Sequence, residues 1–276
     1  SSTGYSRKAL LGLSLPSRLP KRLKQLQRQS AGPVEYAELS EEDQPTLAEF
    51  CALTDPGYQT DRHTELLCRE LEAVEAGETR RLMIFMPPRH SKTFHVSERF
   101  PAWWIGKRPS DQIILASYGS GLAERSSRRA RSLLAHPGYP FPTRIAADSK
   151  AVGHWETTAG GQVHAVGVGG ASTGYGSHLM VIDDPVKDRE QADSEAYRDR
   201  SWEWWTDTGR TRLMPGGSVV LCNTRWHDDD LAGRILNSAG AAEWRVVSLP
   251  AMAEDDDPLG RAPGEALWPE WFDAAA

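Results

Sequence analysis

The chain has 276 residues, of which 39% are hydrophobic and 25% are charged, and its formal net charge is −6. This length can bury a substantial core in one large α/β domain or two small domains. The composition is that of an ordinary globular protein, the negative net charge excludes a static polyanion-binding protein, and no apolar run is long enough to span a bilayer.

The first thirty residues are basic although the whole chain is acidic. They contain seven Lys or Arg residues and no acid. We therefore predict that residues 1–39 form a basic arm or a peripheral helix ahead of the folded domain. A second basic group consists of Arg125, Arg128, Arg129 and Arg131 and is typical of either a solvated helix face or a local DNA contact. Its candidate DNA-binding residues are Arg125, Arg128 and Arg129.

Helical and strand patterns alternate through the rest of the chain. In the first half they predict a helix at 40–53 with Ser40 at its start, a helix at 61–77, a strand at 81–86, a helix from 94 that Pro101 kinks or ends, a strand at 112–118 and a helix at 121–135. In the second half they predict a hairpin of 151–158 and 162–167, strands at 179–182, 218–222 and 244–249, and helices at 194–208 and 228–237. This alternation predicts an α/β fold with a mostly parallel sheet, helices on both faces, and ligands beyond the carboxyl ends of the strands.

The residues that follow the strand at 81–86 are predicted to bind phosphate. A strand, a tight loop and a Lys–Thr pair that opens a helix form the layout of a phosphate-binding loop. Backbone N–H groups and the helix N-terminus would face the anion, and Lys92 would add a full positive charge. The Thr93 hydroxyl would ligate the magnesium ion that accompanies a nucleotide.

This loop departs from the usual G-x-x-x-x-G-K-[ST] pattern, because Met86 and Ser91 replace both glycines. Ser91 is small enough to keep the backbone near phosphates, but it resists a positive φ angle where glycine would not. Taken alone, the loop could also be a solvated turn with a chance Lys–Thr pair.

Two aspartates follow the apolar strand at 179–182. Asp183 would hold the magnesium ion directly or through water, and Asp184 would polarise the attacking water. Taken alone, the two acids could equally be a polar exit from the strand. Their occurrence together with the Lys–Thr loop favours a nucleotide site.

Two further groups belong to the predicted site. Thr224 and Arg225 follow the strand at 218–222, where a hydroxyl and a guanidinium could sense the γ-phosphate and move when it leaves. Arg89, inside the loop, is placed to stabilise the charge that develops on the transferred phosphoryl group.

The chain contains three cysteines, Cys51, Cys68 and Cys222. Their number is odd and their spacing is not that of a metal site. We therefore predict small buried thiols in a reducing compartment rather than a disulfide framework.

Several segments occur in a recognisable order: PPRHSKT (87–93), GGASTGYG (169–176), VIDDPVK (181–187), TRWHDDDLAG (224–233), DPLGR (257–261) and LWPE (267–270). Together they resemble the large terminase subunit of tailed bacteriophages, the motor that packages viral DNA. The resemblance spans most of the chain, from before the loop to the LWPE segment.

The resemblance implies an ATPase of the additional-strand P-loop class, similar to RecA and helicase motors, that couples ATP hydrolysis to DNA translocation. Its implied catalytic residues are Lys92, Arg89 and Asp184. Its other implied site residues are the ATP contacts Pro88, Arg89, His90, Ser91, Lys92 and Thr93, the magnesium ligands Thr93 and Asp183, the coupling residues Thr224 and Arg225, and the adenine contacts Tyr58 and Gln59 upstream of the loop.

The resemblance also implies ATP and Mg²⁺ as substrate and cofactor. The implied partners are double-stranded viral DNA, the portal protein of the procapsid and the terminase small subunit. The chain is expected to be a monomer in solution and to form a homo-oligomeric ring when docked. Its expected place is the cytoplasm of the infected bacterial host, transiently at the portal vertex, with no membrane association and no place in the mature virion.

Two departures from the family pattern matter. Related motors often place Glu where Asp184 stands, and the shorter side chain could slow hydrolysis or require a shifted water. Large terminases normally carry a C-terminal nuclease domain, whereas this sequence ends at Ala276. We therefore expect residues 40–250 to form the P-loop ATPase domain and 251–276 to form a linker or lid leading toward an absent nuclease domain, without DNA cleavage.

Two other functions are compatible with parts of the sequence. The cluster His227–Asp230 could be a divalent-metal nuclease site, although acids are also favoured at a helix N-cap and first turn. The chain could alternatively be a nucleotide-gated assembly module with negligible turnover alone, because an arginine finger in such rings often comes from a neighbouring subunit.

Overall fold

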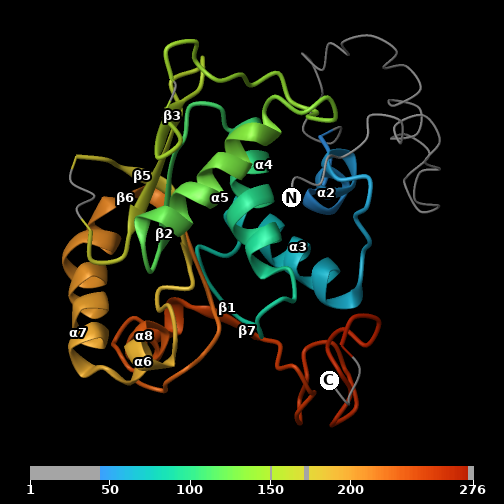
Figure 1. Ribbon diagram of the computed structural model, residues 1–276, viewed down its shortest axis with the longest axis vertical. Coiled ribbons are helices and arrows are strands. Elements are labelled where there is room, and N and C mark those ends of the chain that lie inside the picture. Colours follow the sequence, from blue (N-terminus) through green and yellow to red (C-terminus); the bar gives the residue numbers. More distant parts are fainter. Residues whose placement is uncertain (1–43, 150, 171–173, 273–276) are drawn as a thin grey trace, which may run out of the picture.

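The computed structural model describes residues 44–149, 151–170 and 174–272 (Figure 1). Its centre is a seven-stranded sheet in the order β3-β4-β2-β5-β6-β1-β7. The strands are β1 (Arg81–Phe85), β2 (Gln112–Ser117), β3 (His154–Glu156), β4 (Gln162–Gly167), β5 (Ser177–Asp183), β6 (Leu213–Asn223) and β7 (Arg245–Ser248). All neighbouring strands are parallel except β3 and β4, which form the predicted hairpin. The predicted mostly parallel α/β sheet is therefore confirmed.

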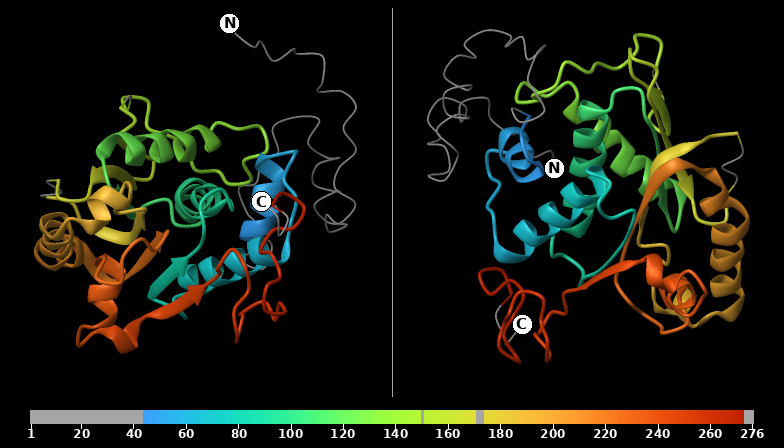
Figure 2. Two further views of the ribbon diagram at one scale, coloured as in Figure 1. Left: turned by 60° about the horizontal axis from the view of Figure 1, so that its bottom comes forward. Right: turned by 180° about the vertical axis from the view of Figure 1, so that it is seen from behind.

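Helices cover both faces of this sheet (Figure 2). Along the chain they are α2 (Leu47–Thr54), α3 (Arg62–Glu75), the π-helical segment η3 (Phe94–Arg99), α4 (Phe100–Lys107), α5 (Ser120–Leu133), α6 (Arg189–Asp193), α7 (Glu195–Glu203), the π-helical segment η4 (Trp204–Gly209), the 3₁₀ turn η5 (Arg210–Arg212), α8 (Leu231–Leu236) and the 3₁₀ turn η6 (Ala241–Glu243). Residues of α2 to α5 pack on one face, and residues of η4 and α8 pack on the other.

The central strands are apolar throughout because they are buried on both sides. In β1, Leu82 and Ile84 belong to the core under α2 to α5, whereas Met83 belongs to the core under η4 and α8. Side chains alternate between the faces of a strand, so a sheet covered on both faces needs a continuous apolar run. The same arrangement aligns the carboxyl ends of β1, β5 and β6 at one edge, where the polar residues begin.

The helix predicted at 40–53 begins later than expected, at Leu47. Thr46 is its N-cap and forms a capping box with Glu49: the Glu49 backbone N–H donates to Thr46 Oγ1 at 3.2 Å, and the Thr46 N–H donates to Glu49 Oε2 at 3.0 Å. Ser40 followed by acids carries a similar start signal, but residues 40–43 lie outside the described part of the chain. The Thr-x-x-Glu pattern directly after a proline was the better signal.

The sequence predicted that Pro101 either kinks or ends the helix after the loop. The helix does not end there. It continues to Lys107, and Pro101 falls in the first turn of α4. Just before it, η3 has a wider π-helical turn, in which the Phe100 N–H bonds to the His95 carbonyl. A proline is tolerated in the first turn of a helix because its missing N–H would have no intrahelical acceptor there. The π-helical turn before Pro101 creates an equivalent position inside a continuous helix.

The remaining differences lie at element ends. The predicted helix at 194–208 is divided into α7 and η4 and is preceded by the short α6, while β6 starts at Leu213 rather than 218. Among the described residues, no helix combines the length and the apolar character that crossing a membrane requires. The predicted basic arm at 1–39 lies outside the described residues.

Candidate functional site

The loop from Met86 to Ser91 joins the end of β1 to a helix whose first residue is Lys92. Two of its residues, Arg89 (φ 63°) and Ser91 (φ 58°), have left-handed backbone conformations without being glycine. Such a conformation costs a side-chain-bearing residue about 1–2 kcal/mol. The Ser91 position therefore adopts the backbone angle of the missing glycine, at an energetic cost.

His95 holds the strained end of this loop. Its Nδ1 lies 2.9 Å from the Ser91 carbonyl oxygen, and its Nε2 lies 3.1 Å from the Tyr58 hydroxyl. A carbonyl only accepts, so Nδ1 carries the proton and Nε2 accepts from Tyr58. Burial lowers the pKa of His95 to about 4, which keeps the ring neutral and preserves this pattern at neutral pH.

Lys92 lies at the centre of the site, although its side chain is almost fully buried. Its Nζ is 3.0 Å from Asp184 Oδ2 and 3.0 Å from Thr224 Oγ1. The Thr224 hydroxyl donates to the Met86 carbonyl at 3.2 Å, and the Thr224 N–H donates to Asp184 Oδ1 at 3.0 Å. The predicted lysine, acid and coupling threonine thus come together from the ends of β1, β5 and β6.

Asp183, the last residue of β5, is 2% exposed. Its Oδ2 accepts from the Ser97 hydroxyl at 2.7 Å, but its buried Oδ1 has no hydrogen-bond partner among the described residues. Burial, and then the neighbouring Asp184 charge, raise the pKa of Asp183 to about 6, against the opposing effects of Ser97, Lys92 and Thr93. A buried carboxylate oxygen without a partner is costly unless a cation approaches it.

A cavity of about 480 Å³ opens beside the loop. It contains the two predicted adenine contacts, Tyr58 and Gln59, together with Ser91. Tyr58 stacks on Phe94 with ring centroids 5.9 Å apart and planes inclined by 4°. The other lining residues are Asp55, Gly57, Thr64, Phe94, His95, Trp268 and Trp271. Sequence reasoning missed Phe94, Trp268 and Trp271 of this wall, although the segment 267–270 contained Trp268.

The His90 ring stacks on the C-terminal segment and also stays within hydrogen-bond distance of the loop backbone at Pro88. It is 5% exposed and stacks on Phe272 at 4.9 Å, with Trp268 at 6.2 Å and its Nδ1 2.9 Å from the Pro88 carbonyl. The side chain therefore contacts Trp268 and Phe272 at the end of the described residues 251–272, a segment that forms no helix or named strand. In Figure 2 this segment lies beside α3, and a buried Asp257–Arg261 ion pair closes it.

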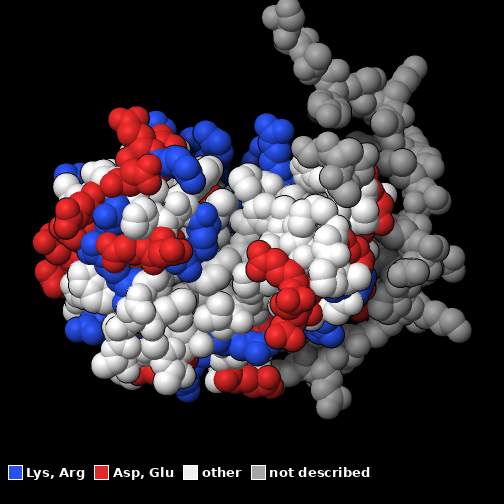
Figure 3. Space-filling view, turned by 90° about the horizontal axis from the view of Figure 1, so that it is seen from below, with Lys and Arg blue, Asp and Glu red and all other residues white. Residues whose placement is uncertain are grey.

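Two of the three acids of the 224–233 segment, Asp229 and Asp230, are engaged by arginines and by a helix cap, whereas Asp228 is exposed. Asp229 lies within 3.1 Å of Arg198 and 2.8 Å of Arg234, and these contacts lower its pKa to about 2. Asp230 caps α8 through the Gly233 N–H at 2.8 Å and pairs with Arg225 Nε at 2.7 Å. Figure 3 shows acidic and basic side chains interleaved over this side of the molecule. Such an arrangement suits an ion-pair network better than a metal cluster.

Arg225 is therefore turned toward the start of α8, away from Lys92, while Thr224 beside it contacts the lysine. Arg89 is exposed in the loop. The candidate DNA-binding residues Arg125, Arg128 and Arg129 are exposed on the solvent side of α5, and their DNA contacts stay a prediction. Of the predicted glycine-rich segment, residues 171–173 lie outside the described chain.

Residues 83–274 match the family model described as terminase large subunit, T4likevirus-type, N-terminal. The chain belongs to this family. The match covers more than half of the chain, and it includes the phosphate loop, the two aspartates and the Thr224 segment of this terminase.

The terminase fold is also similar to the crystal structure of the HK97 bacteriophage large terminase, with 14% sequence identity and a TM-score of 0.49. The alignment covers 78% of this chain and 44% of that chain, so the present chain spans less than half the length of the HK97 protein. No curated protein matches the sequence.

Proposed function

We propose that this terminase chain is an ATP-hydrolysing motor domain of the additional-strand P-loop class, which couples ATP hydrolysis to translocation of double-stranded DNA into a procapsid. The observation that carries the proposal is the buried Lys92 ammonium between Asp184 and Thr224, at the tips of three parallel strands. The strand order β5-β6-β1 supports the class, because one strand lies between the loop strand and the acid strand.

In this proposal the loop 88–93 binds the triphosphate. Lys92 exchanges its contact with Asp184 for phosphate oxygens, and the N–H groups at the start of the helix add partial positive charge. The cavity that contains Tyr58 and Gln59 adjoins Ser91, so it receives the base of a nucleotide whose phosphates lie on the loop.

The residues present also fit a magnesium ion. Asp183 offers a buried carboxylate oxygen without another partner among the described residues, and Thr93 offers a hydroxyl on the adjacent helix turn. Hard divalent cations prefer such oxygen ligands. When bound, Mg²⁺ neutralises charge on the phosphate oxygens.

Asp184 has the role of orienting the attacking water and accepting its proton. It stands one residue past the strand, and its carboxylate is released when Lys92 turns to phosphate. Arg89, on the exposed part of the loop, stabilises the charge that develops on the transferred group. Catalysis here is positioning and electrostatics, with no covalent intermediate on the protein.

Thr224 and Arg225 provide the coupling. Thr224 contacts Lys92, and Arg225 contacts Asp230 at the N-cap of α8. A movement of Lys92 would therefore be transmitted to the N-terminus of α8 through Thr224 and Arg225. In the proposed assembly the chain forms a homo-oligomeric ring at the portal, with DNA and the small subunit, in the host cytoplasm. There this movement would translocate the DNA. Residues 40–250 would form the ATPase domain and residues 251–276 the linker or lid.

The proposal is tested by measuring ATP hydrolysis of the purified chain against protein concentration, with and without double-stranded DNA. We expect specific activity to rise with concentration, as a ring requires, and Lys92→Ala to abolish it. Lys187→Ala, which changes an exposed lysine with 56% side-chain exposure, is the matched control. Turnover that survives Lys92→Ala would refute the site, and flat, near-zero turnover with intact nucleotide binding would instead support an assembly module.

A further inference from the structure

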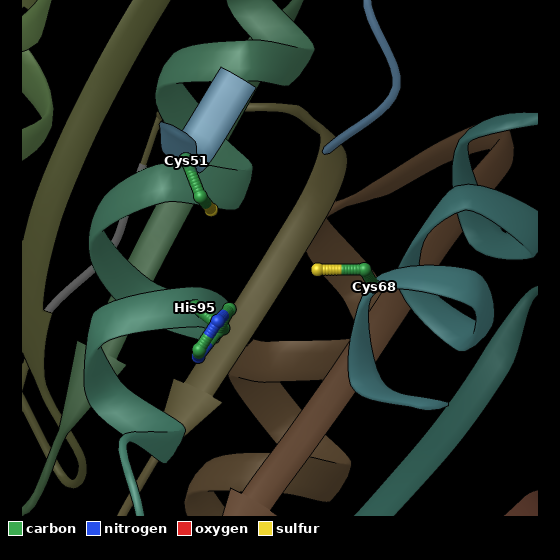
Figure 4. A group of neighbouring side chains, drawn as sticks. All are labelled: Cys51, Cys68 and His95. Atoms are coloured by element: carbon green, nitrogen blue, oxygen red, sulfur yellow. The ribbon is translucent and has the colours of Figure 1, made fainter. Parts of the chain in front are cut away.

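Three soft-ligand side chains converge under the loop helix, and one of them, His95, also lines the cavity proposed for the nucleotide base. Cys51 of α2, Cys68 of α3 and His95 of η3 offer ligand atoms that all lie within 4.8 Å of one another. Both thiols are free, and all three residues are buried. Figure 4 shows the two sulfur atoms directed toward the space beside the imidazole ring.

We propose that Cys51, Cys68 and His95 bind a thiophilic cation of the Zn²⁺ class. Zinc–sulfur bonds of about 2.3 Å and zinc–nitrogen bonds of about 2.0 Å bring neighbouring ligand atoms to about 3.5–3.8 Å in a tetrahedral site. The cluster needs a contraction of only about 1 Å to reach this spacing, which small side-chain rotations can supply. The proposal does not depend on the proposed ATPase function.

The ligand set decides the class of cation. Two thiols and an imidazole, without a carboxylate among the three, favour Zn²⁺ and related soft ions over Mg²⁺ or Ca²⁺. Binding of Zn²⁺ would release the two thiol protons to solvent, and two thiolates would then balance the two charges of the ion. A neutral unit suits a buried place, because an uncompensated charge there is expensive. Cu⁺ would leave the same site with a net negative charge.

The surroundings of His95 are those of a metal-binding histidine. Its Nδ1–H donates to the Ser91 carbonyl, so Nε2 carries the lone pair, which accepts from the Tyr58 hydroxyl in the structure and would turn to the cation instead. A histidine that binds a metal through one ring nitrogen commonly donates its other ring N–H to a backbone carbonyl, which fixes the orientation of the ring. The Tyr58 hydroxyl, 3.1 Å from Nε2 and 4.0 Å from Cys68 Sγ, is the fourth polar atom of the cluster.

The sequence concealed this cluster because its members are far apart. Cys51 and Cys68 lack the close pairing of a zinc-binding motif, and His95 belongs to the helix after the phosphate loop. The fold brings them together because α2, α3 and η3 share one core face of the sheet. A cation here would fix the ring that also holds Ser91.

The test is titration of the reduced full chain with Cd²⁺, followed by the ultraviolet charge-transfer absorption of thiolate-bound Cd²⁺, and competition with Zn²⁺. We expect one equivalent to bind and Zn²⁺ to displace it. Cys51→Ser and Cys68→Ser should each weaken binding by about 100-fold or more, whereas Cys222→Ser, which changes the third buried cysteine, should leave the affinity within about threefold.

Circular dichroism and thermal unfolding establish whether each variant is folded. If a variant is unfolded, the titration of the wild-type chain alone decides the proposal. Absence of a charge-transfer band in the folded wild-type chain overturns the proposal. A band that persists in folded Cys51→Ser and Cys68→Ser also overturns it. A parallel titration with Cu⁺ under anaerobic conditions separates the ions, and binding of Cu⁺ without Cd²⁺ or Zn²⁺ overturns the Zn²⁺ assignment.

Discussion

Lys92 and Asp184 form an ion pair across the strand tips, with Lys92 Nζ 3.0 Å from Asp184 Oδ2. The lysine side chain is 7% exposed and the aspartate side chain is 29% exposed. A phosphate that takes the lysine therefore also frees the carboxylate. In the proposed mechanism the two residues would act in sequence: Lys92 would bind the phosphate, and the released Asp184 carboxylate would accept a proton.

Asp184→Asn should separate binding from chemistry. The amide cannot accept a proton, so we expect turnover to fall by about 100-fold or more, while nucleotide affinity is kept or improved because Lys92 loses its anionic competitor. Steady-state ATPase kinetics and binding of a fluorescent ATP analogue measure the two quantities. Asp184→Glu is the control, since it retains a carboxylate and should retain turnover. Equal loss of binding and turnover in Asp184→Asn would contradict the assigned role.

Ser91→Gly should stabilise the folded chain. Ser91 has a positive φ angle, and its buried Oγ has no hydrogen-bond partner among the described residues. Glycine removes both costs, less its own entropic penalty, so we expect about 1–2 kcal/mol more stability. Urea unfolding measures this change. Ser91→Ala removes the hydroxyl but keeps the Cβ, so it should recover only part of the gain; an equal gain would show that backbone strain contributes nothing.

Asp183→Asn should raise stability at neutral pH while it abolishes ATP hydrolysis. The raised pKa of Asp183, about 6, means that ionising this carboxylate in the folded state is costly. Its favourable contribution is present below the unfolded pKa and is lost as pH rises through 6, so a neutral amide avoids a cost of about 1–3 kcal/mol at pH 7. Chemical denaturation without nucleotide tests the first part, and a Mg²⁺-dependent ATPase assay tests the second. A less stable variant would indicate that the carboxylate is satisfied in the apo chain.

Acid should destabilise the fold through its buried histidines. Burial lowers the pKa of His95 and of His63 to about 4. A group with a lowered pKa contributes stability that is full above its unfolded pKa of about 6.5 and is lost as pH falls toward 4. For His95, which is 1% exposed, the free energy of unfolding should fall by about 3 kcal/mol once the pH is at or below 4.

The measurement is the unfolding free energy in urea at several pH values between 7 and 4, for the wild type and for His95→Gln. Glutamine can still donate to the Ser91 carbonyl but does not titrate. The variant should therefore show a shallower decline with acid than the wild type. Parallel curves would mean that His95 is not among the groups that respond.

The sequence predicted the strands well and the contacts between distant side chains only in part. Lys92, Asp183 and Thr224 follow apolar runs, so their gathering at one sheet edge follows from strand polarity alone. The position of His90 was not predictable in this way, because its neighbours Trp268 and Phe272 belong to a segment without periodicity. The cluster of Cys51, Cys68 and His95 depends on the packing of helices, which residue spacing does not encode.

The boundaries that differed have local causes. The true start of α2 depends on the reciprocal hydrogen bonds of Thr46 and Glu49, which form a better start signal than Ser40. Pro101 failed to end its helix because η3 widens first. Both outcomes involve a few local hydrogen bonds, each with a net contribution of about 1 kcal/mol, which a residue pattern does not resolve.

The stacking of His90 on Phe272 joins the C-terminal end of the described chain to the loop after β1. Residues near position 270 and residues near position 90 therefore order or loosen as one cooperative unit. Amide hydrogens of the loop and of the C-terminal segment should exchange with solvent at matched rates and gain protection together on ligand binding. If the loop binds a triphosphate as proposed, displacement of the C-terminal segment from His90 would weaken that binding and favour release of the nucleotide.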